Sequence, residues 1–76
     1  MMRRNLSKWI PEVIQILAQN NDYLTAKDVA EFFNCSFAIG LSTSDVRYIL
    51  ETAMDNGETI VKLKIGNAHP KYSVMQ

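Results

Sequence analysis

Hydrophobic residues recur three or four positions apart in three stretches of this chain, which predicts three amphipathic helices. The first helix is expected over residues 7–19. The second is expected to begin at Thr25, which is spaced from Asp28 as in a capping box, and to end at residues 34–36. Its predicted buried face consists of Ala26, Val29, Ala30 and Phe33.

The third helix is expected to begin near Ser42, which forms a second capping-box pattern with Asp45, and to stop at Asn56 and Gly57. Its predicted buried positions are Val46, Ile49, Leu50, Ala53 and Met54. After Gly57 the pattern alternates between apolar and polar residues, which predicts a hairpin of two strands. The fold class is therefore α+β, mainly α, with three helices followed by a β-hairpin.

Two segments of the chain, residues 25–34 and 44–60, resemble the second helix, the recognition helix and the first wing strand of winged helix-turn-helix domains. The layout is similar to small enterobacterial regulators of the PapI/FaeA kind, and also to the CaiF/GrlA activators. The resemblance covers residues 7–75 and implies a three-helix winged helix-turn-helix with a C-terminal wing of two or three strands. It also implies a DNA-binding transcriptional regulator of bacterial or phage type.

One segment departs from that pattern. Residues 37–41 lie between the second and third helices, where the turn is usually shorter. They are compatible with a longer loop, with a short strand of the wing sheet or with an extra helical turn. The angle at which the third helix is presented therefore stays open.

The composition is that of an ordinary globule with one hydrophobic core, since the 76 residues are 47% hydrophobic and 21% charged. We expect one domain over residues 1–76, with residues 1–6 as a flexible basic N-terminus. Cys35 is the only cysteine and no signal peptide is recognisable, which predicts a cytoplasmic protein without an internal disulfide. No apolar run approaches the roughly 20 residues of a membrane-spanning helix, so no membrane partner is expected.

The formal net charge is zero, but the charges are segregated along the chain. Residues 1–11 and residues 59–76 contain basic side chains and no acid, whereas all eight acids lie between them. A local potential, rather than the net charge, steers an anionic partner. The basic side chains at the two ends are Arg3, Arg4, Lys8, Lys62, Lys64 and Lys71.

The resemblance implies that the third helix enters the major groove of double-stranded DNA and that the hairpin follows the phosphate backbone. Arg47 is the outward residue best suited to a base, because its planar fork pairs with O6 and N7 of guanine. Thr43 and Ser44 are expected to touch bases or phosphates, and Tyr48 a phosphate oxygen. The wing is expected to neutralise phosphates with Lys62, Lys64 and Lys71, and to carry Asn67 and His69 at its tip.

The charge of the third helix favours protein binding as an alternative to DNA binding. Residues 42–56 carry three acids against Arg47, a net charge of −2, and such a helix suits a basic protein surface better than phosphates. The alternative is a winged helix that binds protein, as an adaptor, antirepressor or inhibitor. Adjacent Phe32 and Phe33 cannot both face one core, so one of them, or Phe37 with Ile39 and Leu41, is expected to form an exposed contact surface. Trp9 and Ile10 are expected to do the same, which would suit a homodimer.

Catalysis is not expected. Cys35 and His69 are the only residues of their kinds, and the chain has no HExxH, CxxC or P-loop spacing. Paired acids one helical turn apart, as at Glu51 and Asp55, are more typical of a solvated helix face than of an acid–base pair. The sequence therefore predicts no enzyme, no metal site and no cofactor.

Overall fold

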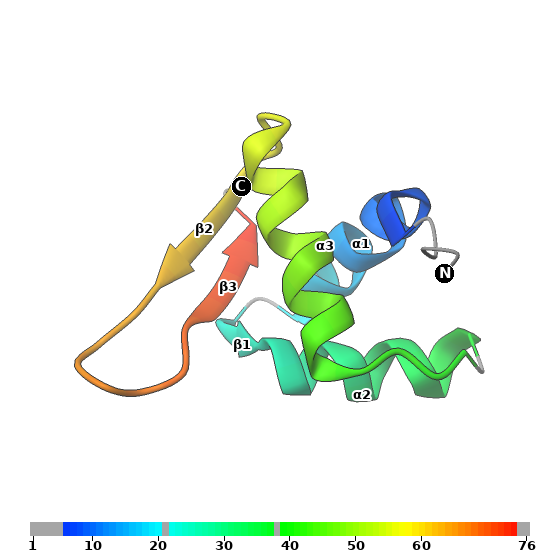
Figure 1. Ribbon diagram of the computed structural model, residues 1–76, viewed down its shortest axis with the longest axis horizontal. Coiled ribbons are helices and arrows are strands. Elements are labelled where there is room, and N and C mark those ends of the chain that lie inside the picture. The colour runs from blue at the N-terminus through cyan, green and yellow to red at the C-terminus, as the bar shows by residue number, and fades with distance from the viewer. Residues whose placement is uncertain (1–5, 21, 38, 75–76) are drawn as a thin grey trace, which may run out of the picture.

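Three helices pack around one core, and a small antiparallel sheet lies beside the third helix (Figure 1). The computed structural model describes residues 6–20, 22–37 and 39–74, so the predicted basic segment with Arg3 and Arg4 lies outside the described residues. The elements in chain order are η1 (Leu6–Trp9, a 3₁₀ turn), α1 (Ile10–Asn20), β1 (Leu24–Thr25), α2 (Ala26–Phe37), α3 (Thr43–Asp55), β2 (Ile60–Leu63) and β3 (Lys71–Val74). This order confirms the predicted α+β, mainly α, fold class.

Both predicted capping boxes are formed. The Asp28 backbone N–H donates to Thr25 Oγ1 over 3.1 Å, and the Thr25 N–H donates to the Asp28 carboxylate over 3.2 Å. Ser42 and Asp45 repeat the arrangement at the start of α3, with both distances 3.1 Å. Each box satisfies backbone donors that the first turn of a helix leaves unpaired, so these helices begin where the sequence places them.

The predicted end of the second helix at residues 34–36 is wrong, because α2 continues to Phe37. Phe37 packs one turn after Phe33, with ring centroids 4.8 Å apart, and this contact favours the additional helical residues. The Asn34 side chain does not stop the helix. It accepts the Leu41 backbone N–H over 2.9 Å and donates to the Leu41 carbonyl over 3.0 Å, so it ties the loop before α3 to α2.

The sheet has three strands in the order β1-β3-β2, all antiparallel. Its third strand is β1, only two residues long and directly before α2, and the sequence analysis missed it. Residues 39–41, offered as a candidate strand, form none. Tyr72 in the central strand pairs with Leu24 on one side and Lys62 on the other, so the chain before α2 anchors the C-terminal hairpin.

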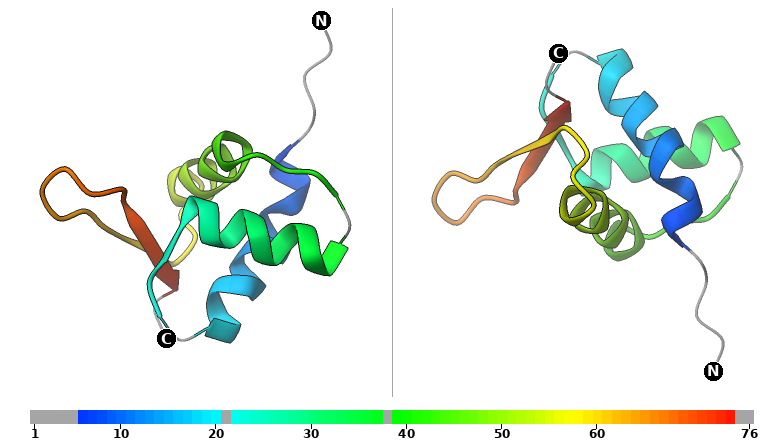
Figure 2. Two further views of the ribbon diagram at one scale, coloured as in Figure 1. Left: turned by 90° about the horizontal axis from the view of Figure 1, so that it is seen from below. Right: turned by 90° about the horizontal axis from the view of Figure 1, so that it is seen from above.

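The predicted helix faces form the core. All four predicted positions of α2 are buried, as are those of α3 except Met54, which is half-buried. In the hairpin, Ile60 and Tyr72 are buried while the β2–β3 loop extends away from the helices (Figure 2). Fully buried large side chains are Tyr72, Phe33, Leu17, Ile49, Leu50, Val13, Val29 and Val46.

Candidate nucleic-acid interface

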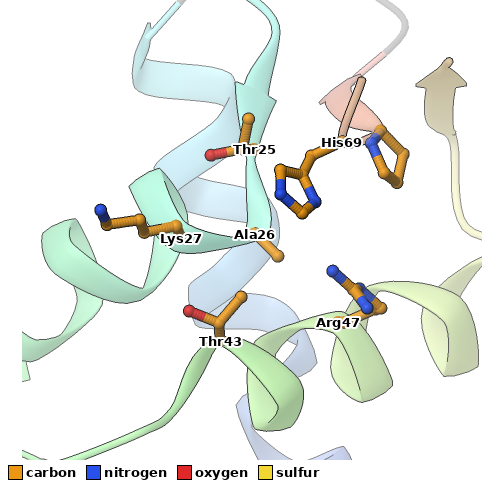
Figure 3. Close-up of a pocket in the computed structure, with 7 residues that line it drawn as sticks. Thr25, Ala26, Lys27, Thr43, Arg47 and His69 are labelled. Atoms are coloured by element: carbon orange, nitrogen blue, oxygen red, sulfur yellow. The ribbon is translucent and has the colours of Figure 1, made fainter. Parts of the chain in front are cut away.

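Three elements converge on one hollow of about 290 Å³. These are the start of α2, the N-terminal half of α3 and the end of the loop that leads into β3 (Figure 3). Arg47 and His69 reach toward the space between these elements, and the Lys27 ammonium points outward from α2. The residues that line the hollow are Thr25, Ala26, Lys27, Thr43, Arg47, His69 and Pro70.

Local helix structure explains why these side chains meet. Thr25 caps α2, and Thr43 is the first residue of α3, so the N-termini of two helices open on the hollow. Arg47 follows Thr43 by four residues and therefore shares its face of α3. Helix N-termini carry partial positive charge and unpaired N–H groups, which together with a guanidinium favour an anion.

The charges around the hollow are of one sign. Of the described residues that line it, Lys27 and Arg47 are cationic and none is acidic. The nearest acids in sequence, Asp28 and Asp45, accept hydrogen bonds from backbone N–H groups in the capping boxes. The arrangement is chemically suited to hold phosphate oxygens, since it offers the N–H fork of Arg47 beside the partial positive charge of two helix N-termini.

The structure brings together three of the predicted site residues and distributes the others around them. Thr43, Arg47 and His69 line the hollow, whereas exposed Ser44 and Tyr48 lie next to Arg47 on α3 without lining it. On the hairpin, the remaining predicted residues are all exposed to solvent. They are Lys62, Lys64, Asn67 and Lys71.

Lys62 has an acidic partner that the sequence analysis did not foresee. Its Nζ lies 2.9 Å from Glu51 Oε2 on α3, and the Tyr72 hydroxyl donates to the same oxygen over 2.9 Å. Lys62 and Tyr72 are directly opposite each other on β2 and β3. The three side chains therefore connect both wing strands to α3, and they neutralise one of the three acids of that helix.

The protonation states of this cluster follow from its contacts. The hydrogen bond from the Lys62 ammonium lowers the pKa of Glu51, and the Tyr72 hydroxyl adds to this effect against the opposing influence of burial. Burial and the hydrogen bond to Glu51 raise the pKa of Tyr72 to about 12. At neutral pH the cluster is therefore a carboxylate held by an ammonium and a neutral phenol.

The cluster predicts a pH dependence of stability. Glu51 contributes stability above its usual pKa of 4.5 and loses it as the pH falls through the lowered folded pKa. Tyr72 contributes its full stabilisation below pH 10.0, its usual pKa, and loses this stabilisation as the pH rises toward its folded pKa of about 12. Tyr72→Phe should cost about 1 kcal/mol at neutral pH and reduce the alkaline loss.

The measurement is urea unfolding of the wild type and Tyr72→Phe at pH 7 and pH 11. Tyr48→Phe is the matched control, because Tyr48 is 54% exposed and makes none of these contacts. An alkaline loss of stability that is equal in the wild type and in Tyr72→Phe would contradict the role given to Tyr72.

Sequence reasoning missed two polar residues of the hollow, Thr25 and Lys27. Thr25 was identified only as a helix cap. Lys27 lies in the first turn of α2, one residue after the helix begins. The only signal in the sequence was the helix-turn-helix order itself, which brings the start of the second helix close to the third.

The helices, the hairpin and their arrangement define a winged-helix domain. No protein-family model matches the sequence, and no curated protein sequence matches it. Among solved structures, the chain is similar to one from a study of the DNA recognition and protein interaction domains of HOP2. That likeness has a TM-score of 0.70 at 20% identity and covers 87% of this chain and 97% of the other.

A second similar structure is the iron-containing ferric uptake regulator of Francisella tularensis, with a TM-score of 0.65 at 15% identity. The alignment covers 97% of this chain but 53% of the regulator, so the chain spans about half the length of that protein. Both likenesses confirm the winged-helix fold. The resemblance to the PapI/FaeA and CaiF/GrlA regulators stays a prediction.

Neither a membrane-spanning helix nor a cluster of metal ligands is found in the described part of the chain. No helix there is long and apolar enough to cross a membrane. Among the same residues, no three His, Cys, Asp or Glu side chains are grouped so that they could hold a metal ion. Cys35 is exposed near the end of α2 and does not line the hollow.

Proposed function

We propose that this domain binds double-stranded DNA and regulates transcription by occupying its site, without a catalytic step. The observation that carries the proposal is the hollow into which Arg47 reaches beside two helix N-termini, with Lys27 at its edge and no acid among its described lining residues. The HOP2 structure comes from work on DNA recognition, which supports the same partner. A DNA partner favours an intracellular location, and we propose the cytoplasm.

In this proposal the N-terminal half of α3 enters the major groove. Arg47 pairs with a guanine, Thr43 and Ser44 contact bases or phosphates, and Tyr48 reaches a phosphate oxygen. Lys27 binds the phosphate that faces the start of α2. The wing contributes Lys64, Lys71, Asn67 and His69.

Lys62 is assigned a different role from the one its sequence position indicated. Its ammonium is held by Glu51, so we assign it to positioning the wing against α3 rather than to a phosphate. The same pairing weakens the objection raised by the acidic third helix. The other two acids of α3 lie elsewhere. Asp45 accepts a hydrogen bond from the Ser42 backbone N–H, and Asp55 is the last residue of α3, at the opposite end from Thr43.

The test is a titration of a 20-base-pair duplex of random sequence, followed by fluorescence anisotropy at several salt concentrations. About three phosphate contacts, from Lys27, Lys64 and Lys71, predict that log K falls with log salt with a slope of about −2.7. Absence of binding even at low salt would overturn the proposal.

Lys27→Ala is expected to weaken binding to all sequences alike and to reduce the salt slope by about 0.9, since one phosphate contact is lost. Lys8→Ala is the matched control. This substitution removes the same charge from η1, and Lys8 does not line the hollow. Equal effects of the two substitutions would show that Lys27 acts only through the net charge of the domain.

A second candidate function is protein binding, as an adaptor, antirepressor, inhibitor or homodimer. It is favoured by two aromatic side chains of α2, Phe32 and Phe37, which are 45% and 39% exposed. Leu41 and Ile10 were expected to contribute to exposed contact surfaces, but both are buried and do not. Self-association that is lost in a Phe32→Ser/Phe37→Ser double variant, together with no DNA binding, would favour this function.

A further inference from the structure

The tip of the hairpin exposes apolar side chains. Leu63 at the end of β2 is 40% exposed, and Ile65 is 71% exposed, the highest value among the large hydrophobic residues that the structure describes. The Ala68 N–H donates to the Ile65 carbonyl over 3.1 Å and closes a turn in which Gly66 has a positive φ of 56°. Ile65 is the first residue of this turn, and the loop between β2 and β3 that contains it extends away from the helices (Figure 2).

These side chains border a second hollow of about 310 Å³, lined by Leu63, Ile65, Ala68, His69 and Lys71. Leu63 and Lys71 are directly opposite each other in the hairpin, so they share one face of it. His69 lines both this hollow and the one that contains Arg47. The apolar tip is thus continuous with the candidate DNA interface.

The charges around the tip are all positive. Residues 59–74 contain three lysines and no acid. Lys62 is paired with Glu51, but Lys64 and Lys71 have no acidic partner within the described residues. Lys64 stands between Leu63 and Ile65 in the sequence, so a cation flanks the two apolar side chains. A partner that fits must be anionic at its rim and apolar inside.

Duplex DNA has this combination in its minor groove, where phosphates border a narrow channel with sugar and base edges as its walls. Apolar side chains of minor-groove proteins enter between base pairs, unstack them in part and bend the duplex. Isoleucine and leucine are among the residues that act in this way. A membrane surface or a second copy of the chain fits less well, since neither explains why the tip adjoins the hollow with Arg47.

We propose that the hairpin tip is a wedge that inserts Ile65, supported by Leu63, into the minor groove next to the major groove occupied by α3, and that it bends the DNA. Lys64 and Lys71 neutralise the phosphates on either side of the insertion. This inference rests on the proposed DNA-binding function. It adds a consequence that DNA binding alone does not require, namely a change in the shape of the DNA.

The experiment uses a 30-base-pair duplex with a fluorescence donor and acceptor at its ends, titrated with the full chain. Wild-type protein should increase energy transfer, as bending brings the ends together. Ile65→Ser should abolish that increase and lower the affinity about tenfold, since it removes the buried apolar group. Tyr23→Ser is the matched control, because Tyr23 is 39% exposed and lies before β1, outside both hollows, so its loss should leave both quantities unchanged.

The outcomes separate the inference from the proposed function. Binding of the wild type without any increase in energy transfer would overturn the wedge and leave DNA binding intact. An increase that persists in Ile65→Ser would overturn it as well. Loss of wild-type self-association in Ile65→Ser, with unchanged DNA binding, would assign the tip to a second copy of the chain. No DNA binding by the wild type would overturn the proposed function itself.

Discussion

Replacing Phe33 with alanine is expected to lower the free energy of unfolding by about 3–5 kcal/mol, because it empties a large site in the core. Phe33 is fully buried, meets Trp9 edge to face at 5.3 Å and lies 4.8 Å from Phe37. A domain of this size has a total stability of roughly 4–11 kcal/mol. The loss is therefore between about a quarter and all of the total stability, so the variant should unfold at a much lower urea concentration than the wild type.

The neighbouring residue supplies a matched control. Phe32 is 45% exposed, so Phe32→Ala should change the free energy of unfolding by about 0.5 kcal/mol or less. Phe33→Leu keeps an apolar side chain and should cost about 1.5 kcal/mol, which leaves a folded variant to measure. Urea unfolding followed by circular dichroism gives all three values. Equal losses at positions 32 and 33 would contradict the packing described for α2.

Replacing Arg47 with alanine is expected to reduce the affinity for the preferred DNA sequence by about 10- to 100-fold. Arg47 is exposed on the N-terminal half of α3 and reaches into the hollow toward His69 (Figure 3). Its fork is the group in this part of α3 that can distinguish guanine from other bases through two hydrogen bonds. Most of the loss should therefore be confined to the preferred sequence, and random DNA should be affected less.

Arg47→Lys is the informative control, since it keeps the positive charge and removes the two-pronged geometry. It should retain affinity for random DNA and lose most of the discrimination. The measurement is competition between a selected sequence and random duplex at constant salt. If Arg47→Lys discriminates as well as the wild type, Arg47 contacts phosphate and another residue reads the bases.

Much of the helical structure was predictable because its signals are local. The capping boxes at Thr25 and Ser42 depend on side chains three residues apart, and both are formed. The buried face of α2 follows from a repeat that only a helix converts into one surface. Of the candidate site, Thr43 and Arg47 were predictable as neighbours, since they lie four residues apart on α3.

Other features depend on contacts between distant parts of the chain. The strand β1 has two residues and shows no alternation, so only its pairing with β3 defines it. The extension of α2 to Phe37 depends on Phe33 and on the Asn34 bonds to Leu41. The partner of Lys62 lies 11 positions away on another element, where no local pattern could indicate it.

The amino-acid order by itself determined the three α-helices, the places where α2 and α3 begin, and the alternating hairpin. Each of these features depends on residues within one or two helical turns or within one run of alternating residues. The tertiary structure alone decided which charges act together. It pairs Lys62 with Glu51 and places Lys27, Arg47 and His69 around one hollow. Electrostatic partnership depends on distance in space, and that distance is set only when the sheet packs against α3.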